Sequence, residues 1–199
     1  MLWIGLTGGI ATGKSAAAAI LREMSIPVID ADVLAHQELQ PGSESFQSIV
    51  QEFGSRILSQ DGTICRQELA MLIFSNENER VKLEAIIHPK VQEKVKHFRE
   101  KQIFMGTEIA VYDVPLLFEK NLESQFDGVL LIDCEDQIQL DRLMTRNGLS
   151  VTEAKLRMAV QMDMNMKRVR ATWVIENNST RDELKIVLQQ WLQNLLQSR

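Results

Sequence analysis

At 199 residues the chain is long enough for one α/β core with an inserted or appended helical part, and too short for two large independent domains. Hydrophobic residues make up 45% and charged residues 25%, which is ordinary for a globular protein and argues against disorder. The net charge of -5 offers no basic surface for nucleic acid or a membrane, and no apolar run approaches the roughly 20 residues that span a bilayer. We therefore expect a cytoplasmic monomer that binds neither nucleic acid nor membranes.

The first predicted elements are a strand and a helix joined by a glycine-rich turn. Residues 2–7 form a short apolar run followed at once by two glycines, which predicts a buried strand ending in a tight turn. Residues 14–24 are good helix formers, and the sequence Ser-Ile-Pro at 25–27 ends the run. Between strand and helix, residues 8–15 read GGIATGKS and satisfy the P-loop pattern G-x-x-x-x-G-K-[ST] in the context that it requires.

The residue types in this loop suit the binding of phosphate. Several backbone N–H donors must converge on the anion, and Gly8 and Gly13 supply a backbone without side-chain bulk. Lys14 places a point charge on the β and γ oxygens, and Ser15 offers a hydroxyl to Mg²⁺. The alternative is a glycine turn beside a surface lysine. The predicted nucleotide contacts are Gly8, Gly9, Ile10, Ala11, Thr12, Gly13, Lys14 and Ser15.

A P-loop alone does not separate a kinase from a GTPase or a motor ATPase. A guanine-specific switch protein is expected to carry an Asn-Lys-x-Asp string for the base and an Asp-x-x-Gly turn after its third strand. Neither string occurs in this sequence.

Further strands and a last helix complete the predicted core. Apolar runs that end in a carboxylate lie at 27–30, 109–113 and 129–133, and 173–175 is a weaker fifth strand. Strands that alternate with helical patterns predict an α/β fold with a five-stranded parallel sheet flanked by helices. The apolar stripe at 184–195 predicts a final helix that packs on this sheet.

Acidic residues at the strand ends are candidates for a catalytic base and a metal ligand. Asp30 and Asp32 follow the second strand, and ligands of such sheets bind at the carboxyl ends of the strands. We expect Asp32 to be the general base and Asp30 to cap the next helix, with a capping role as the alternative for Asp32. Asp113 should end the strand beside the P-loop strand, the Walker B position for Mg²⁺, unless it is a plain turn residue.

Two helical stretches interrupt the sheet. Residues 33–106 show helical periodicity and no convincing strand, which predicts an inserted helical subdomain that binds the acceptor. Residues 141–170 are expected to form a helical lid, in which Ser150 and Glu153 predict a capping box. The core of this single domain, 1–199, is therefore expected over 1–32, 107–140 and 171–199.

Basic residues of the lid are candidates for closing over the phosphates, because phosphoryl transfer needs its charge neutralised. Arg142 is the first candidate and Arg146 the second, with a solvated helix face as the alternative for either. His88, which precedes Pro89, is expected to end a helix. It either caps that helix or contacts a substrate phosphate.

Two strings are more specific than the P-loop, namely Asp-Ala-Asp at 30–32 and Asp-Val-Pro-Leu-Leu-Phe-Glu at 113–119. With the P-loop and its leading strand, their order and spacing resemble the dephospho-CoA kinases over nearly the whole chain. Further matching positions are Ala35, His36, Asp61, Gly62, Arg66, Leu83, Ile86, His88, Pro89, Gln139, Arg142, Arg146, Gln161 and 175–177.

This resemblance implies a P-loop kinase fold and transfer of the γ-phosphate of ATP to the ribose 3′-hydroxyl of dephospho-CoA, the last step of coenzyme A synthesis. The implied partners are ATP and dephospho-CoA, and the implied metal is Mg²⁺. Carried over position by position, it implies catalytic roles for Asp32, Lys14 and Arg142, ATP contacts for Arg142 and Asn177, acceptor contacts for Asp32, His88 and Leu116, and metal contacts for Ser15 and Asp113.

The chain departs from the family pattern in a few places. Ala11-Thr12 stands where Gly-Ser is usual, which should be tolerated because neither side chain need point at phosphate. Thr172-Trp173 and Asn178-Ser179 also differ from the usual residues around Asn177. The alternative functions are another small-molecule or nucleoside kinase of this fold, and an ATP-binding regulator that acts by conformational change.

Overall fold

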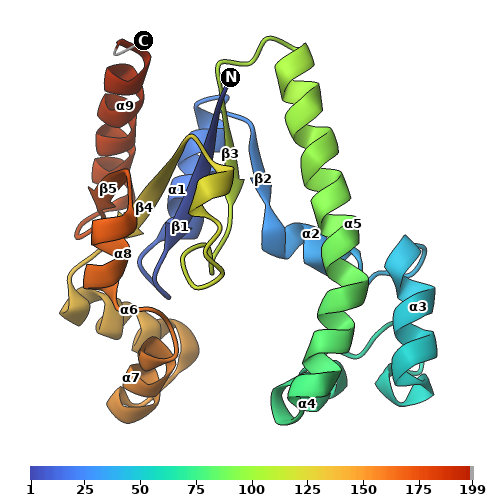
Figure 1. The fold of residues 1–199 in the computed structure, drawn as a ribbon. Helices are drawn as coiled ribbons and strands as arrows, with labels where there is room; N and C mark the ends of the chain where they lie inside the picture. Colours follow the sequence, from blue (N-terminus) through green and yellow to red (C-terminus); the bar gives the residue numbers. More distant parts are fainter. Residues whose placement is uncertain (198–199) are drawn as a thin grey trace. The chain divides into compact units, whose positions relative to one another are not determined.

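The computed structural model describes residues 1–197, and within them a five-stranded parallel sheet of order β2-β3-β1-β4-β5 is flanked by helices (Figure 1). This confirms the predicted α/β fold. Residues 198 and 199, which belong to the expected core segment 171–199, lie outside the described residues. The strands are β1 (Leu2–Gly8), β2 (Val28–Asp30), β3 (Ile109–Asp113), β4 (Gly128–Asp133) and β5 (Trp173–Glu176).

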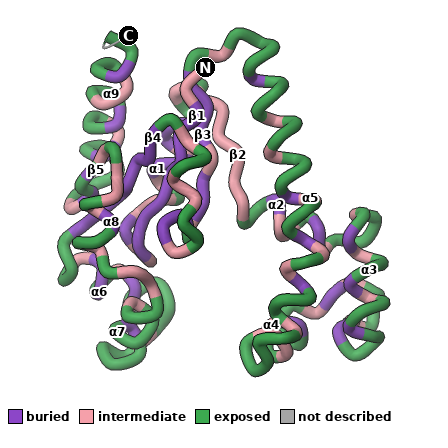
Figure 2. The backbone as a smooth tube through the Cα atoms, in the orientation of Figure 1, coloured by how far each residue is buried: buried purple, intermediate pink, exposed green. Residues whose placement is uncertain are grey.

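The central strands are buried along almost their whole length (Figure 2). They read as continuous apolar runs because helices cover both faces of a parallel sheet. In the register of the ladder, Leu6 of β1 lies opposite Asp113 of β3, and Thr7 lies opposite Leu131 of β4. The carboxyl end of β3 is thereby set beside the end of the P-loop strand, as the sequence predicted.

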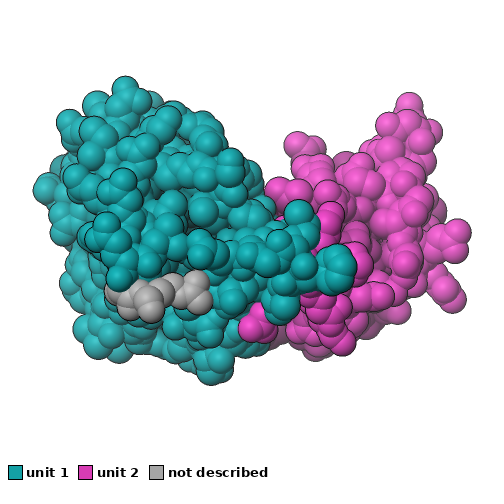
Figure 3. All heavy atoms as spheres, turned by 90° about the horizontal axis from the view of Figure 1, so that it is seen from above, with its two compact units in different colours: residues 1–29, 102–199 teal, residues 30–101 magenta. Residues whose placement is uncertain are grey.

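The chain forms two compact units, one of residues 1–29 with the chain from Gln102 onward, and the other of Asp30–Lys101 (Figure 3). The helices of the first unit are α1 (Lys14–Glu23), η2 (Glu123–Gln125), α6 (Asp136–Asn147), α7 (Val151–Ala159), α8 (Met164–Arg170) and α9 (Arg181–Gln197). The helices of the second unit are α2 (Ala31–Gln37), α3 (Glu44–Phe53), η1 (Ser55–Ile57), α4 (Arg66–Ser75) and α5 (Glu77–Phe104), whose last residues belong to the first unit.

The core of the first unit lies between the sheet and two helices. Leu21 of α1 and Leu188 of α9 share one buried cluster with Ile4 of β1. The stripe on α9 therefore packs as predicted except at Val187, which is 38% exposed. Burying one such side chain stabilises the fold by about 1.5–3 kcal/mol, so the stripe fixes α9 against the sheet.

Aromatic side chains mark two places in this unit. The ring of Trp3, on β1, stacks on that of Tyr112, on β3, with 5.9 Å between centroids. The ring of Trp173, on β5, meets that of Trp191, on α9, edge to face at 5.7 Å. Both pairs thus join elements that are distant in the sequence.

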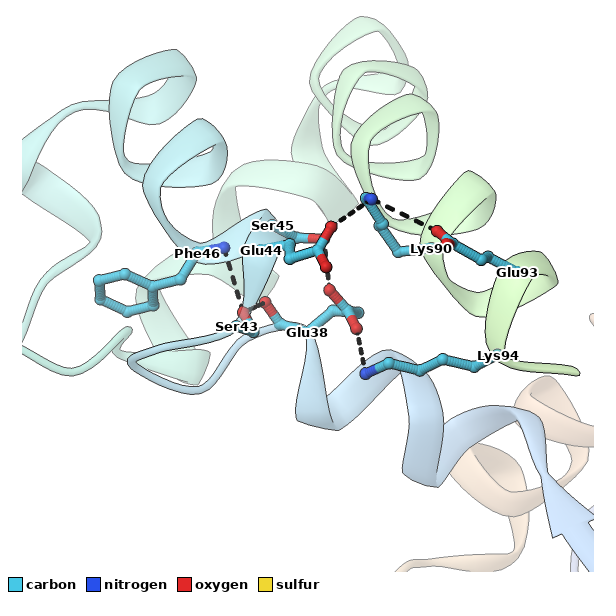
Figure 4. A network of polar contacts seen from close by, with 8 residues as sticks. All are labelled: Glu38, Ser43, Glu44, Ser45, Phe46, Lys90, Glu93 and Lys94. Atoms are coloured by element: carbon cyan, nitrogen blue, oxygen red, sulfur yellow. Dashed lines mark hydrogen bonds and ion pairs between the residues drawn. The ribbon is translucent and has the colours of Figure 1, made fainter. Parts of the chain in front are cut away.

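The second unit contains a buried carboxylate. Glu38 is only 1% exposed. It accepts a hydrogen bond from Ser45 at the start of α3 and forms an ion pair with Lys94 of α5 (Figure 4). Burial raises the pKa of Glu38, but the hydrogen bonds from Lys94 and Ser45 outweigh it, so the pKa lies below its ordinary value. Close by on the surface, Lys90 pairs with Glu44. Glu38 thus ties three helical segments together.

One predicted break is wrong. His88-Pro89 was expected to end a helix, but α5 runs through it from Glu77 to Phe104. A proline inside a helix costs roughly 3 kcal/mol, so packing must offset it. Ile87 and Val91, on either side of the proline, are both buried.

Other local predictions hold. Ser150 begins α7 with the predicted capping box, in which its hydroxyl accepts from the N–H of Glu153 and the Glu153 carboxylate accepts from the N–H of Ser150. Across the described residues 1–197, no helix is both long and apolar enough to cross a bilayer.

Candidate functional site

The P-loop connects the end of β1 to the start of α1. Gly13 precedes α1 with a φ of 98°, in the left-handed region that favours glycine. A Cβ atom at this position would lie 2.0 Å from Nδ2 of Asn177, so no larger residue fits without rearrangement. That same Nδ2 donates to the carbonyl of Thr12 at 2.8 Å. Asn177, expected at the nucleotide, is thus in direct contact with the loop.

The two residues of the loop that depart from the family pattern, Ala11 and Thr12, have separate local explanations. The buried Thr12 hydroxyl donates to the Gly9 carbonyl at 3.0 Å, so this side chain turns back into the loop. Ala11 has a φ of 63°, and it packs against the buried cluster of Leu140, Leu143 and Ala154. A left-handed conformation costs a non-glycine residue about 1–2 kcal/mol, which the packing of the methyl group partly offsets.

Lys14 and Asp113 meet at the carboxyl ends of β1 and β3. Their side chains form an ion pair, and they are 14% and 1% exposed. Asp113 is therefore neither distant from the loop nor a plain turn residue. Ser15 lies next to Lys14 in the first turn of α1 and is exposed. A carboxylate and a hydroxyl are hard oxygen donors, which suits Mg²⁺ held partly by substrate phosphates.

Arg142 lies on α6, close to Asn177. Its guanidinium donates to the carbonyl of Asn177 at 2.8 Å and to that of Ser179 at 3.1 Å. Asn177 also donates its N–H to the Asp133 carbonyl at 2.7 Å, at the end of β4. Two predicted ATP contacts are thereby brought together. Arg146, the second candidate, is exposed and bonds to its neighbour Asn147.

The end of β4 carries a second buried carboxylate. Asp133 pairs with Arg168 of α8, and this hydrogen bond raises the pKa of Arg168 despite partial burial. Next to it, burial raises the pKa of the Cys134 thiol to about 11. The thiol is therefore protonated at neutral pH, in keeping with a buried free cysteine.

The acceptor candidates are exposed. Asp30 caps α2, since its Oδ1 accepts from the N–H groups of Asp32 and Val33 at 2.9 and 3.1 Å. The alternative interpretation of Asp32 as the cap is therefore wrong, and Asp32 lies in the first turn of α2 with an exposed side chain. His88 lies exposed in the middle of α5 and cannot be a helix cap. Leu116, in the turn after β3, is 40% exposed.

Four further residues of the first unit received no role from the sequence. Gln139 and Gln161 bond to the backbone of Ile10. Glu119 and Lys167 form an ion pair of 2.7 Å in which the lysine side chain is fully buried. Charge and amide content alone cannot distinguish such residues from a solvated helix face. The available signal was that Gln139, Gln161 and Glu119 fall on matching positions of the family pattern.

Comparisons with known proteins agree with this geometry. A family model described as "Dephospho-CoA kinase" matches residues 2–183. The chain is 46% identical over 194 residues to a dephospho-CoA kinase of Geobacillus kaustophilus, covering 96% of each chain. Among solved structures, it resembles TT1252 from Thermus thermophilus with a TM-score of 0.79 and 34% identity, over 98% of this chain and 97% of that one. It also resembles a dephospho-CoA kinase from Campylobacter jejuni with a TM-score of 0.70 and 27% identity, over 97% and 96%.

Proposed function

This chain belongs to the dephospho-CoA kinase family, and from that premise we propose which of its residues carry out the reaction. The protein is an ATP-dependent phosphotransferase that catalyses the final step of coenzyme A biosynthesis. The observation that supports the residue assignment best is the ion pair of Lys14 with the buried Asp113, beside a loop that admits only glycine at Gly13.

For the nucleotide, we assign the loop from Gly8 to Ser15. Its N–H groups and the N-terminus of α1 bind the phosphates, and Lys14 neutralises charge on the β and γ oxygens. Ser15 and Asp113 would hold Mg²⁺, which supplies further charge neutralisation when bound. Lys14 then exchanges its contact with Asp113 for the phosphate oxygens.

Arg142 and Asn177 are also assigned to the nucleotide, since Asn177 contacts the loop at Thr12 and Arg142 contacts Asn177. Asn177 keeps the Thr12 carbonyl in place, and Arg142 holds the loop after β5 through two carbonyls. The loop so fixed offers a surface for the adenine. Arg142 carries a cation that adds to the charge stabilisation of the transferred group.

For the acceptor, we assign Asp32, His88 and Leu116. The 3′-oxygen of dephospho-CoA forms a bond to the γ-phosphorus while the bond from that phosphorus to the β,γ-bridging oxygen breaks, which releases ADP. The proton of the 3′-hydroxyl passes to the carboxylate of Asp32. This carboxylate can serve as a base because Asp30 provides the cap of α2. His88 contacts a phosphate of the acceptor, and Leu116 contacts its apolar part.

The acceptor is tested with purified protein and ATP offered dephospho-CoA, adenosine, AMP or shikimate. We expect ADP release with dephospho-CoA alone. Release with another acceptor but not dephospho-CoA would favour the alternative kinase, and turnover without any acceptor would favour an ATP-binding regulator. Light scattering on the same preparation tests the expected monomer.

The base is tested by a matched pair of variants. Asp32→Asn should lower kcat by about 10²-fold or more and leave the KM for ATP unchanged. Asp30→Asn retains a good capping residue and should leave kcat near that of the wild type. Equal activity of Asp32→Asn and the wild type would remove Asp32 from the catalytic residues.

A further inference from the structure

Both polar backbone groups of Ile10, the third residue of the P-loop, are held by glutamine side chains. Its N–H donates to Oε1 of Gln161 at 2.7 Å, and its carbonyl accepts from Nε2 of Gln139 at 2.8 Å. Gln139 comes from α6, and Gln161 comes from the turn between α7 and α8. These bonds fix the two peptide units that flank Ile10. Because the remaining N–H groups of the loop must converge on phosphate, these peptide orientations set part of the binding geometry.

Packing reinforces the two hydrogen bonds. The side chains of Ile10 and Ala11 contact the buried cluster formed by α6 and α7. Gly9 permits a still closer approach, since a Cβ atom there would lie 2.7 Å from Nε2 of Gln139 and 2.9 Å from Sδ of Met164. The first half of the P-loop is therefore packed against α6, which carries Gln139, and against α7, which precedes the turn that carries Gln161.

The turn that carries Gln161 is held in place by a hydrogen bond at the next residue. The next residue, Met162, donates its N–H to Oε1 of Glu119 at 3.1 Å, and the same oxygen pairs with the buried Lys167. Glu119 follows β3, whose last residue is Asp113. The Glu119 carboxylate thus links the turn that carries Gln161 to α8. It also links that turn to the segment after Asp113, the candidate metal ligand.

We propose that Gln161, with Gln139, is a positioning residue of the P-loop. Gln161 holds the N–H of Ile10, so that the other loop N–H groups point together toward the ATP phosphates. This inference rests on the proposed function, because it takes the loop to bind ATP.

The chemistry of Gln161 offers a sharp test of its position. A carboxylate of the same shape still accepts the hydrogen bond from Ile10, but it places a negative charge beside a loop that binds a triphosphate. A residue that only stabilises the fold tolerates this change without any specific effect on nucleotide affinity. Gln161→Glu therefore separates a position beside the phosphates from general support of the structure.

The experiment compares Gln161→Met, Gln161→Glu and Gln139→Met with the wild type in the full-length chain. Calorimetry measures the Kd of a non-hydrolysable ATP analogue, kinetics give kcat and both KM values, and NMR follows the Ile10 amide. Gln137→Met is the matched control, because Gln137 is an exposed glutamine of α6, the helix that also carries Gln139, and its amide donates to Asp141 at 2.9 Å.

We expect Gln161→Met to weaken analogue binding about tenfold, to shift the Ile10 amide resonance, and to leave the KM for dephospho-CoA unchanged. Gln161→Glu should keep the Ile10 amide protected from exchange and still bind the analogue at least about tenfold more weakly. Should Gln161→Met fail to fold, Gln161→Glu and Gln139→Met carry the test.

The inference is overturned if the Gln161 variants match Gln137→Met in analogue affinity and in the Ile10 resonance. It is also overturned if Gln161→Glu binds the analogue as tightly as the wild type. If the wild type shows no change in its P-loop amides on binding the analogue, the proposed function fails as well, which distinguishes the two failures.

Discussion

The two compact units carry their candidate residues in opposite ways. In the first unit, Lys14, Asp113 and Asn177 are largely buried and bonded to other parts of that unit. In the second, Asp32 and His88 are exposed, and the buried polar residues are Glu38 and its hydrogen-bond partner Ser45. Three residues that we assign to the nucleotide are thus held in place by the fold, whereas Asp32 and His88, which we assign to the acceptor, are exposed to solvent. Substitutions should therefore affect stability and activity together in the first unit and separately in the second.

The largest effect should come from Lys14→Met. Losing this charge at the transferred group should lower kcat by about 10³-fold. It should also destabilise the protein by about 3 kcal/mol, because the Asp113 carboxylate stays buried without its lysine. Kinetics and urea unfolding measure the two effects. The double variant Lys14→Met/Asp113→Asn should recover stability and not activity, and recovery of both would contradict the assignment.

A comparable loss of stability is expected where no catalytic role is assigned. Lys167→Met should cost about 3–5 kcal/mol in urea unfolding, since it leaves the Glu119 charge without its buried partner. Glu119→Gln in the same chain should restore part of this loss and keep an acceptor for the N–H of Met162. Lys185→Met, at an exposed surface pair, is the control and should cost less than about 1 kcal/mol. Equal costs for the two lysines would contradict the buried pair.

In the second unit, Glu38→Gln should cost about 1–3 kcal/mol at neutral pH and leave kcat unchanged. The pKa of Glu38 is lowered in the folded state, so its carboxylate stabilises the fold above the unfolded pKa near 4.5. That contribution is lost as the pH falls through the lower folded value. Urea unfolding from pH 7 downward should therefore show the gap between wild type and variant closing in acid.

The control for this measurement is Glu44→Gln, at the neighbouring surface pair with Lys90. Because the Glu44 side chain is 76% exposed, its loss should change stability by less than about 1 kcal/mol. If the stability difference between the wild type and Glu38→Gln stays constant with pH, the charge of Glu38 is not the cause of that difference.

The smallest effect concerns the cap of α2. Asp30→Ala removes the acceptor for two N–H groups and should cost about 1 kcal/mol, as measured by urea unfolding. Asp30→Asn should cost only a few tenths of that amount. If the two variants are equally stable, the cap contributes little and the placing of Asp32 must come from elsewhere.

The sheet could be predicted because its signals are local. Each strand is an apolar run, and residues such as Asp113 mark where the runs end, so sequence order and burial point to the same fold. The cap at Asp30 and the capping box of Ser150 follow from side chains that bond to their own helix. The sequence therefore predicted these features without knowledge of distant contacts.

What the sequence could not predict depends on distant partners. Pro89 is a helix breaker by its own chemistry, yet α5 continues through it where its neighbours Ile87 and Val91 are buried. Lys167 has the same charge as an exposed lysine, and its burial is accompanied by an ion pair with Glu119, which is distant in the sequence. The role of Gln139 and Gln161 depends on their hydrogen bonds to Ile10, which lies more than a hundred residues away from either in the sequence.

The aromatic pairs of the sheet give the protein its own optical label. The sequence contains three tryptophans, and Trp3, Trp173 and Trp191 all belong to the first unit. Intrinsic indole emission therefore reports on the first unit alone, while far-ultraviolet circular dichroism sums the helices of both units. Disagreement between the two signals during denaturation would reveal that the units melt separately, without any dye or engineered probe.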